Sequence, residues 1–543
     1  MSGWFSHLIA APIVLPLLGG LTMLFFDERR RTLKGAIGFV ATLAVTATAG
    51  WLLYVVGTDG VGGLQHVYRL GNWPAPFAIV LVLDKLSALM LALTSILAFA
   101  SLVFSLARWH RAGVYFHPLF QFLLMGLNGA FLTGDLFNLF VFFEVTLAAS
   151  YGLVLHGSGL ARVKAGMHYI AVNLATSFLF LIGVSLIYGV AGTLNMADLA
   201  VRIPRIEAED RMLLEAGAAV LGIAFLVKAG MWPLSFWLPP AYSAAVPPVA
   251  AVFAIMTKLG VYVVLRLSLL LFGDGAGASA GLGGDWLLYG GLATIAFGMF
   301  GVLAAQDTVR IASFSILVSS GTLLAAIGTN RVGVTAGALF YLVSSTLAIG
   351  AFFLLTELVE RGREFGADML AVTREAFGEP GEEDLADDAE VGIPVPATMA
   401  MLGISFLSCA VLLAGLPPLS GFLAKFALLA GLFDAAEGGA DVVPGAAWAF
   451  VVLLILSGLA ALIAMTRAGI RSLWNERDVP RIGIIEIAPV AGLLLLCLTL
   501  TVQAGPVMAY MEATARSLHD PVGYVQDVLA TRAGLVGTGE AGR

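Results

Sequence analysis

The chain has 543 residues, of which 59% are hydrophobic and only 12% are charged, and its net charge is −7. Soluble domains carry about twice that share of charged residues, so the composition excludes a soluble protein, and the absence of a basic stripe argues against nucleic acid as a partner. Apolar runs long enough to cross a bilayer recur along almost the whole length, which predicts an all-α polytopic membrane protein.

The hydropathy profile predicts about 14 transmembrane helices. The first apolar run precedes its positive residues, which is the reverse of a signal peptide, so we expect it to stay in the protein as a helix. Lys and Arg are about twice as frequent in one set of alternate loops, which places that set in the cytoplasm and both termini outside. The expected spans are residues 8–26, 35–57, 77–107, 116–134, 136–156, 169–191, 213–244, 247–272, 286–305, 309–328, 333–359, 397–433, 447–466 and 484–506.

These spans group into four parts along the chain. Residues 1–110 hold three helices, and residues 484–543 hold the last helix and a polar C-terminal tail. Residues 111–272 and 286–466 each hold five spans, and the fourth span of each group is interrupted. We therefore expect two five-helix repeats of opposite topology, each with one discontinuous helix, as in many transporters.

The third span begins with the charged residues Asp84 and Lys85. A lysine near the end of a span can extend its ammonium to the membrane surface, and this alternative stands beside an accessory role for the two residues in ion transfer. Arg266, in the eighth span, is expected to reach the headgroup region or a carbonyl at a helix end.

Glu144, Lys228 and Lys258 lie deep inside predicted spans. Glu144 comes eight residues after Leu136, and a rise of about 1.5 Å per residue puts it about 12 Å into its span. A charge near the bilayer centre costs at least ~2.5–3.5 kcal/mol and marks a functional candidate. A structural buried ion pair is the alternative, but such pairs are costly to form, so several in one chain favour an ion-translocation path.

The first interrupted span breaks near residues 228–240. Pro233 has no amide hydrogen, so we expect it to free a carbonyl and end the helix one turn after Lys228. Irregular backbone at membrane depth survives only where it is buried in protein or lines a polar cavity. A simple proline kink is the alternative to a transport site at this break.

The second interrupted span repeats the pattern near residues 415–425. Pro417, Pro418 and Gly421 break the helix shortly before Lys425. Two breaks in corresponding halves, each beside a lysine, indicate an inverted-repeat transporter with its site at the breaks.

Polar side chains within the tenth and eleventh spans include Ser319, Ser320 and Thr346, which are candidates for holding the waters of a proton path. Packing between helices is an equally good explanation for such residues. An acidic cytoplasmic loop follows at residues 360–395. We interpret its acidic stretch, residues 364–390, as a solvated loop, with attraction of cations or docking of a partner as the alternative.

Four stretches of the sequence together carry a family resemblance. They are Phe142-Phe143-Glu144, the run that begins Lys228-Ala-Gly-Met-Trp-Pro-Leu-Ser-Phe-Trp-Leu-Pro-Pro, the run Met256-Thr-Lys-Leu-Gly260, and Leu416-Pro-Pro-Leu-Ser-Gly-Phe422. They resemble the proton-translocating subunits shared by respiratory complex I and Mrp-type cation/proton antiporters, over about residues 80 to 500. A lysine at position 425 makes the chain most similar to the D subunits of Mrp (also called Pha) antiporters.

The resemblance implies a function and its partners. Glu144 would pair with Lys228, and Lys258 would relay protons towards Lys425. The chain would exchange H⁺ for Na⁺ or K⁺ in the bacterial cytoplasmic (inner) membrane, beside a larger homologous subunit and small multi-span subunits. We expect no cofactor, no metal site, no catalytic residues and no nucleic-acid partner.

Two other functions remain as alternatives. The first is a proton-pumping, antiporter-like membrane subunit of a complex I-type NADH–quinone oxidoreductase or a membrane hydrogenase. The second is a stand-alone carrier of a small solute, which is disfavoured because no span offers an arginine or aromatic pocket for an organic anion.

In the leading hypothesis, Glu144 and Lys228 switch between a paired and a separated state, because burial favours their neutral forms and pairing restores both charges.

Overall fold

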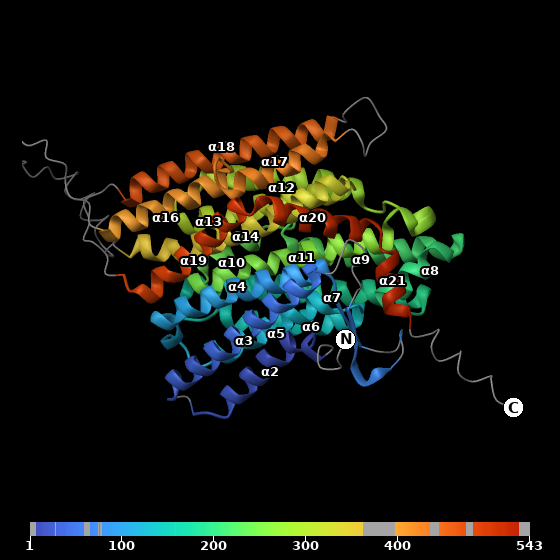
Figure 1. Cartoon of the computed structure of the whole chain (residues 1–543), viewed down its shortest axis with the longest axis horizontal. Coiled ribbons are helices and arrows are strands. Elements are labelled where there is room, and N and C mark those ends of the chain that lie inside the picture. Colours follow the sequence, from blue (N-terminus) through green and yellow to red (C-terminus); the bar gives the residue numbers. More distant parts are fainter. Residues whose placement is uncertain are drawn as a thin grey trace, which may run out of the picture.

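A computed structural model shows a bundle of long helices that run side by side along one axis (Figure 1). The structure describes residues 7–27, 29–58, 66–73, 75, 79–157, 159–361, 397–434, 445–473 and 482–530. Within these ranges, twelve helices are long and apolar enough to cross a membrane, and α2 (Ala11–Leu24) and α5 (Phe116–Leu132) are shorter apolar helices of the same bundle. Together they give the 14 expected spans. The acidic stretch 364–390 lies outside the described residues.

The N-terminal part consists of three helices and a small sheet. Helices α2, α3 (Arg31–Thr58) and α4 (Lys85–Ala107) pack on one another, and the 3₁₀ turn η2 (Trp109–Arg111) follows α4. Strands β1 (His66–Arg69) and β2 (Val80–Leu83) pair antiparallel between α3 and α4, with His66 opposite Leu83. The 3₁₀ turn η1 (Leu70–Asn72) lies between the strands.

The two five-helix groups follow in chain order. The elements of the first group are α5, α6 (Leu136–Val154), α7 (Leu160–Ala191), α8 (Met196–Arg202), η3 (Ile203–Arg205), α9 (Ala208–Ala229), α10 (Leu238–Ala244) and α11 (Pro247–Phe272). After η4 (Asp274–Ser279), the elements of the second group are α12 (Gly284–Ala304), α13 (Thr308–Gly328), α14 (Val332–Glu360), α16 (Ala397–Ala414), α17 (Ser420–Leu432) and α18 (Gly445–Leu473). Helices α11 and α14 lie at the centre, where their membrane-spanning windows are completely buried.

The C-terminal part is more helical than a polar tail. Helix α19 (Ile484–Val502) has Gln503 as its C-cap, and α20 (Ala504–His519) and α21 (Val522–Leu529) follow it. Both α19 and α20 pack along α14, so the chain follows that helix beyond the apolar run that hydropathy detects. Helix α20 is amphipathic and not apolar throughout, and its buried face consists of Met511, Thr514, Ala515 and Leu518.

Arginines mark one end of the bundle, called here the basic end. Arg361 forms ion pairs with Glu357 of α14 and Glu486 of α19, and Arg467 of α18 donates to the carbonyl of Leu303 at the end of α12. The opposite end, called here the strand end, contains β1, β2, α8 and α21. Arg361 and Arg467 both belong to the set of alternate loops that is richer in Lys and Arg in the sequence.

Both interrupted spans end their first halves in the same way. Gly230 after α9 and Gly415 after α16 have left-handed φ values of 75° and 73°. Each is followed by an amide that reaches back five residues, from Met231 to Leu226 and from Leu416 to Val411, at 3.0 Å. This is the Schellman pattern of a helix C-terminus, in which glycine adopts the left-handed conformation without a steric penalty.

The glycine, and not the proline, therefore ends the first of these helices. Helix α9 stops at Ala229, one residue after Lys228, whereas Pro233 lies three residues beyond the capping glycine Gly230. The expectation that Pro233 breaks the helix one turn after Lys228 is corrected in this detail. Pro417 and Pro418 lie between α16 and α17, and Gly421 is the second residue of α17.

Candidate ion-transfer site

Lys228 lies in the last turn of α9 with none of its surface exposed. Its ammonium donates a hydrogen bond to Asn173 Oδ1 of α7 at 3.3 Å. It also lies 5.3 Å from the ring centre of Phe143 and 5.9 Å from that of Tyr169. Aromatic faces and one amide oxygen thus surround a buried cation, which is favourable by cation–π attraction but leaves no counter-charge in contact among the described residues.

Glu144 of α6 is half-buried, and its Oε1 atom has no hydrogen-bond partner among the described residues. The carboxylate acts electrostatically on Lys228, but the two described side chains form no ion pair with each other. Glu144 and Lys228 are therefore not in hydrogen-bond contact in the structure. The paired arrangement stays a prediction.

Lys258 of α11 is also fully buried, and its ammonium donates to Ser319 Oγ of α13 at 2.7 Å. Ser319 in turn shares a hydrogen bond of 2.9 Å with Ser345 of α14. The neighbouring residue Ser344 shares a hydrogen bond of 2.8 Å with Ser420, the first residue of α17. One hydroxyl contact thus joins Lys258 to α13 and α14, and a separate one joins α14 to the start of α17.

The helices that carry Lys228 and Lys258 are in close backbone contact. A Cβ atom added to Gly260 would lie 2.6 Å from the amide nitrogen of Ala229, which is too close for any side chain. Gly260 comes two residues after Lys258, and Ala229 comes one residue after Lys228. The absent side chain at Gly260 thus lets the two lysines lie at the same level of the bundle.

Lys425 of α17 reaches back across the second break. Its ammonium donates to the carbonyl of Ala414, the last residue of α16, at 2.9 Å. Cβ atoms added to Gly415 and Gly458 would lie 3.0 Å and 3.2 Å from the same nitrogen. Two glycines and a free helix-end carbonyl therefore form the pocket of this lysine.

The chain is similar to known proteins over most of its length. Residues 133–439 match the family described as NADH:quinone oxidoreductase/Mrp antiporter, transmembrane. The chain belongs to this family. Relatives include a protein of Rhizobium meliloti named as the D subunit of a probable K⁺/H⁺ antiporter, 62% identical over 98% of this chain and 100% of the relative. Another, of Alkalihalophilus pseudofirmus, is named as the D subunit of a Na⁺/H⁺ antiporter and is 33% identical over 96% and 99%.

Solved structures show the same fold as this NADH:quinone oxidoreductase/Mrp family member. A chain in the Mrp complex from Dietzia sp. DQ12-45-1b has a TM-score of 0.81 at 26% identity, covering 97% of this chain and 100% of that one. A chain of respiratory complex I from Thermus thermophilus has a TM-score of 0.71 at 21% identity, covering 94% and 99%. The resemblance drawn from the sequence motifs is thereby confirmed.

The three candidate polar residues of α13 and α14 differ in position. Ser319 bonds Lys258 directly, as described above. Ser320 Oγ is buried and has no hydrogen-bond partner among the described residues, and Thr346 Oγ1 donates to the carbonyl of Leu342 in its own helix. Of the three, only Ser319 contacts a lysine of the series within the described part of the chain.

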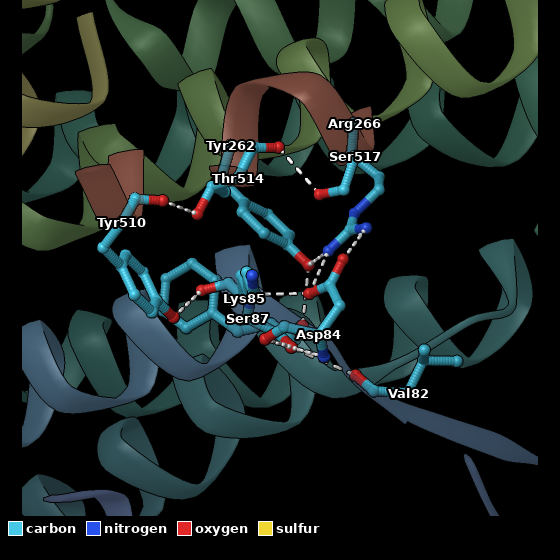
Figure 2. A network of polar contacts seen from close by, with 10 residues as sticks. Val82, Asp84, Lys85, Ser87, Tyr262, Arg266, Tyr510, Thr514 and Ser517 are labelled. Atoms are coloured by element: carbon cyan, nitrogen blue, oxygen red, sulfur yellow. Dashed lines mark hydrogen bonds and ion pairs between the residues drawn. The ribbon is translucent and has the colours of Figure 1, made fainter. Parts of the chain in front are cut away.

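Asp84 and Lys85 follow strand β2 at the strand end of the bundle, where Figure 2 shows them beside Arg266 and Tyr510. Asp84 caps α4 by accepting from the amide of Ser87 at 2.8 Å. Its carboxylate forms an ion pair with Arg266 through both oxygens, one of them at 2.9 Å. The carbonyl of Lys85 accepts from Tyr510 of α20 at 2.7 Å. The expectation that Arg266 reaches a headgroup or a helix-end carbonyl is wrong, because the Asp84 carboxylate is its partner.

Two polar residues near the lysine series, Asn173 and Ser420, are not predicted as site residues from the sequence. Asn173 is a buried amide in the long apolar span α7, and such a residue is itself a signal of a functional contact. Ser420 follows the prolines of the second break closely. Pro417 and Pro418 indicate the helix break in the sequence, whereas the Ser420 hydroxyl gives no separate signal of a functional contact.

Proposed function

We propose that this chain is the D subunit of a multi-subunit monovalent cation/proton antiporter and carries protons through the series Glu144, Lys228, Lys258 and Lys425. The observation that carries the proposal is the burial of three lysines at successive positions of two interrupted repeats, none of them in an ion pair with another described residue. Relatives that match the chain over nearly its whole length bear antiporter subunit names.

Proton movement along this series requires each lysine to alternate between ammonium and amine. Lys228 would release a proton when Glu144 moves away, and the Lys258 amine would accept one through water between the two helices. Lys258 would pass its proton on past Ser319, whose hydroxyl is already in contact with it at 2.7 Å. The hydroxyl of a serine can accept one proton while it donates another, so the serine contacts suit a relay.

We propose K⁺ as the exchanged cation. The relative at 62% identity is named as a subunit of a probable K⁺/H⁺ antiporter, whereas the relatives named as Na⁺/H⁺ antiporter subunits are 31% and 33% identical. The chain would work in the bacterial inner membrane with the basic end in the cytoplasm, in keeping with the distribution of basic residues. Its partners would be a larger homologous subunit and several small multi-span subunits.

The test is cation-driven proton movement in everted membrane vesicles from cells that express the whole complex and lack other antiporters. Lys228→Ala should abolish the exchange, because the series then loses a proton carrier. Lys164→Ala removes an exposed lysine at the start of α7 and should leave exchange unchanged. Full exchange by the Lys228→Ala complex, at normal protein level, would refute the relay. Exchange measured with K⁺ and with Na⁺ in turn shows which cation the complex transports.

The alternative is a proton-pumping subunit of a redox complex, since the chain also shares its fold with a chain of respiratory complex I. Purification of the chain from its native membrane in mild detergent separates the two functions. Cofactor-free multi-span partners would support the antiporter. Partners with flavin and iron–sulfur centres would overturn it in favour of the redox pump.

A further inference from the structure

An apolar groove lies on the side of the bundle where α19 is followed by α20. Its volume is about 360 Å³, within the range of roughly 300–1,000 Å³ that is usual for sites of small organic ligands. Helices α3, α4, α14, α19 and α20 all contribute to its walls. Most of the lining side chains are apolar, among them Leu89, Leu93 and Ile96 of α4 and Val507 of α20. Such walls exclude a polar ligand and fit a hydrocarbon.

The two hydroxyl-bearing side chains of the groove direct their hydroxyls elsewhere. The Thr499 hydroxyl donates to the carbonyl of Leu495 in its own helix at 2.9 Å. The Tyr510 hydroxyl donates to the carbonyl of Lys85 at 2.7 Å, as Figure 2 shows. These hydroxyls therefore already have acceptors within the chain, and the ring of Tyr510 adds to the apolar wall.

Lys85 lies at one end of the groove. It is the first residue of α4, and Leu89, Ala92 and Ile96 follow it by four, seven and eleven residues, so the helical repeat places all four on one face. Lys85 is partly exposed, and its ammonium has no hydrogen bond or ion pair with another described residue. One cation is thus present where the apolar walls begin.

The depth of the groove matches one leaflet of a bilayer. Lys85 begins α4 at the strand end, and a rise of about 1.5 Å per residue puts Leu89 about 6 Å and Ile96 about 16 Å further into the bundle. Half of the hydrocarbon core of a bilayer is about 15 Å thick. The groove therefore runs from a cation near the membrane surface to the middle of the bilayer, which is the course of a lipid acyl chain.

The charges around Lys85 favour an anionic ligand. Two acidic residues belong to the start of α4 and to α20, and both form ion pairs within the chain. Asp84 pairs with Arg266, and Glu512 pairs with Arg516 at 3.1 Å. The cationic part of a zwitterionic headgroup would find both of these acids occupied, whereas the phosphate of an anionic headgroup finds the Lys85 ammonium.

We propose that the groove binds one acyl chain of an anionic phospholipid, whose phosphate pairs with the Lys85 ammonium. The chain fills the space that α4 and α20 leave between them. Its floor is α14, where Val343 and Leu347 line the groove on the face opposite to Ser345. The lipid site is therefore separate from the lysine series, and its occupancy does not rest on the proposed proton relay.

Photolabelling of the assembled complex tests the site. The complex is reconstituted in phosphatidylcholine vesicles with a trace of phosphatidylglycerol that carries a diazirine on one acyl chain, and the adducts are mapped by mass spectrometry of peptides. We expect adducts on residues 89–96 and 500–507. They should be about fivefold fewer in Lys85→Ala, because one lysine near the membrane surface strengthens the binding of an anionic lipid by about that factor. Lys85→Arg keeps the charge and should keep the labelling.

Two tryptophan variants and a second lipid complete the test. Val507→Trp fills the groove and should remove these adducts, whereas Val502→Trp, at a position 74% exposed and outside the groove, should keep them. Phosphatidylcholine with the same diazirine should label the groove about fivefold less.

Two outcomes would overturn the site. Equal labelling by the two lipids, or no effect of Lys85→Ala, would refute the contact between Lys85 and the phosphate. A groove without adducts, in a complex whose other helices are labelled, would refute the lipid and indicate a helix of a partner subunit in its place. Labelling needs no ion gradient, so both outcomes are independent of cation/proton exchange.

Discussion

The amide of Asn173 is the hydrogen-bond partner of the buried Lys228 ammonium. Asn173→Leu would remove this partner, and hydrogen bonds to charged groups contribute about 1.5–3 kcal/mol. We expect cation-driven proton exchange in everted vesicles to slow at least about tenfold, since ~1.4 kcal/mol corresponds to a factor of ten. Thr176→Val is the matched control, because Thr176 is buried one turn away and bonds the carbonyl of Val172 in its own helix. Unchanged exchange in Asn173→Leu would show that the amide is not needed.

At the same scale, the sequence predicts which lysines are buried but not what they contact. The depth of Lys228 follows from the apolar residues before it, because hydropathy and helical rise are local properties. Asn173 precedes Lys228 by 55 residues. No local feature of the sequence shows which face of α7 packs against α9. The partner of Lys258, Ser319, is predicted only as one of several hydroxyls, since packing between helices uses the same residue types.

At the scale of single elements, the capping glycines determine where the lysines lie. Gly415→Ala would place a Cβ atom 2.6 Å from Lys425 Cδ and force a left-handed alanine, which costs about 1–2 kcal/mol. We expect the Lys425 ammonium to leave the Ala414 carbonyl and proton exchange to fall about tenfold. Gly403→Ala, within α16 and with no described atom within 4 Å of its added Cβ, should exchange protons at the normal rate. Equal rates in the two variants would contradict this role of Gly415.

Helix breaks are only partly readable from the sequence. Prolines indicate that two spans are interrupted, because a missing amide is a property of the residue itself. Gly230 ends α9 because the backbone folds back there. The sequence contains many glycines, and it does not show which of them cap a helix and which allow helices to pack closely. The continuation of α19 into α20 is not visible in hydropathy, since α20 is stabilised by burial against α14 and not by its own apolar length.

At the scale of the whole molecule, one buried ion pair joins three distant parts of the chain. Asp84 belongs to the start of α4 and Arg266 to the end of α11. The Arg266 guanidinium lies 5.4 Å from the ring centres of both Tyr262 and Tyr524, and Tyr524 belongs to α21. Tyr510 of α20 bonds the backbone next to Asp84, as Figure 2 shows. The C-terminal helices are thus fastened to the strand end through this cluster.

Asp84→Asn tests this fastening without removing the cap of α4, because asparagine caps helices as well as aspartate does. It leaves the Arg266 guanidinium buried without its counter-charge, and breaking a buried pair in this way costs about 3–5 kcal/mol. We expect the purified protein in detergent to unfold a few degrees lower and protease to cut within α20 and α21 sooner. Lys85→Ala keeps the backbone carbonyl that Tyr510 uses and should unfold at the normal temperature. If both variants unfold together and resist protease equally, the ion pair does not hold the C-terminal helices in place.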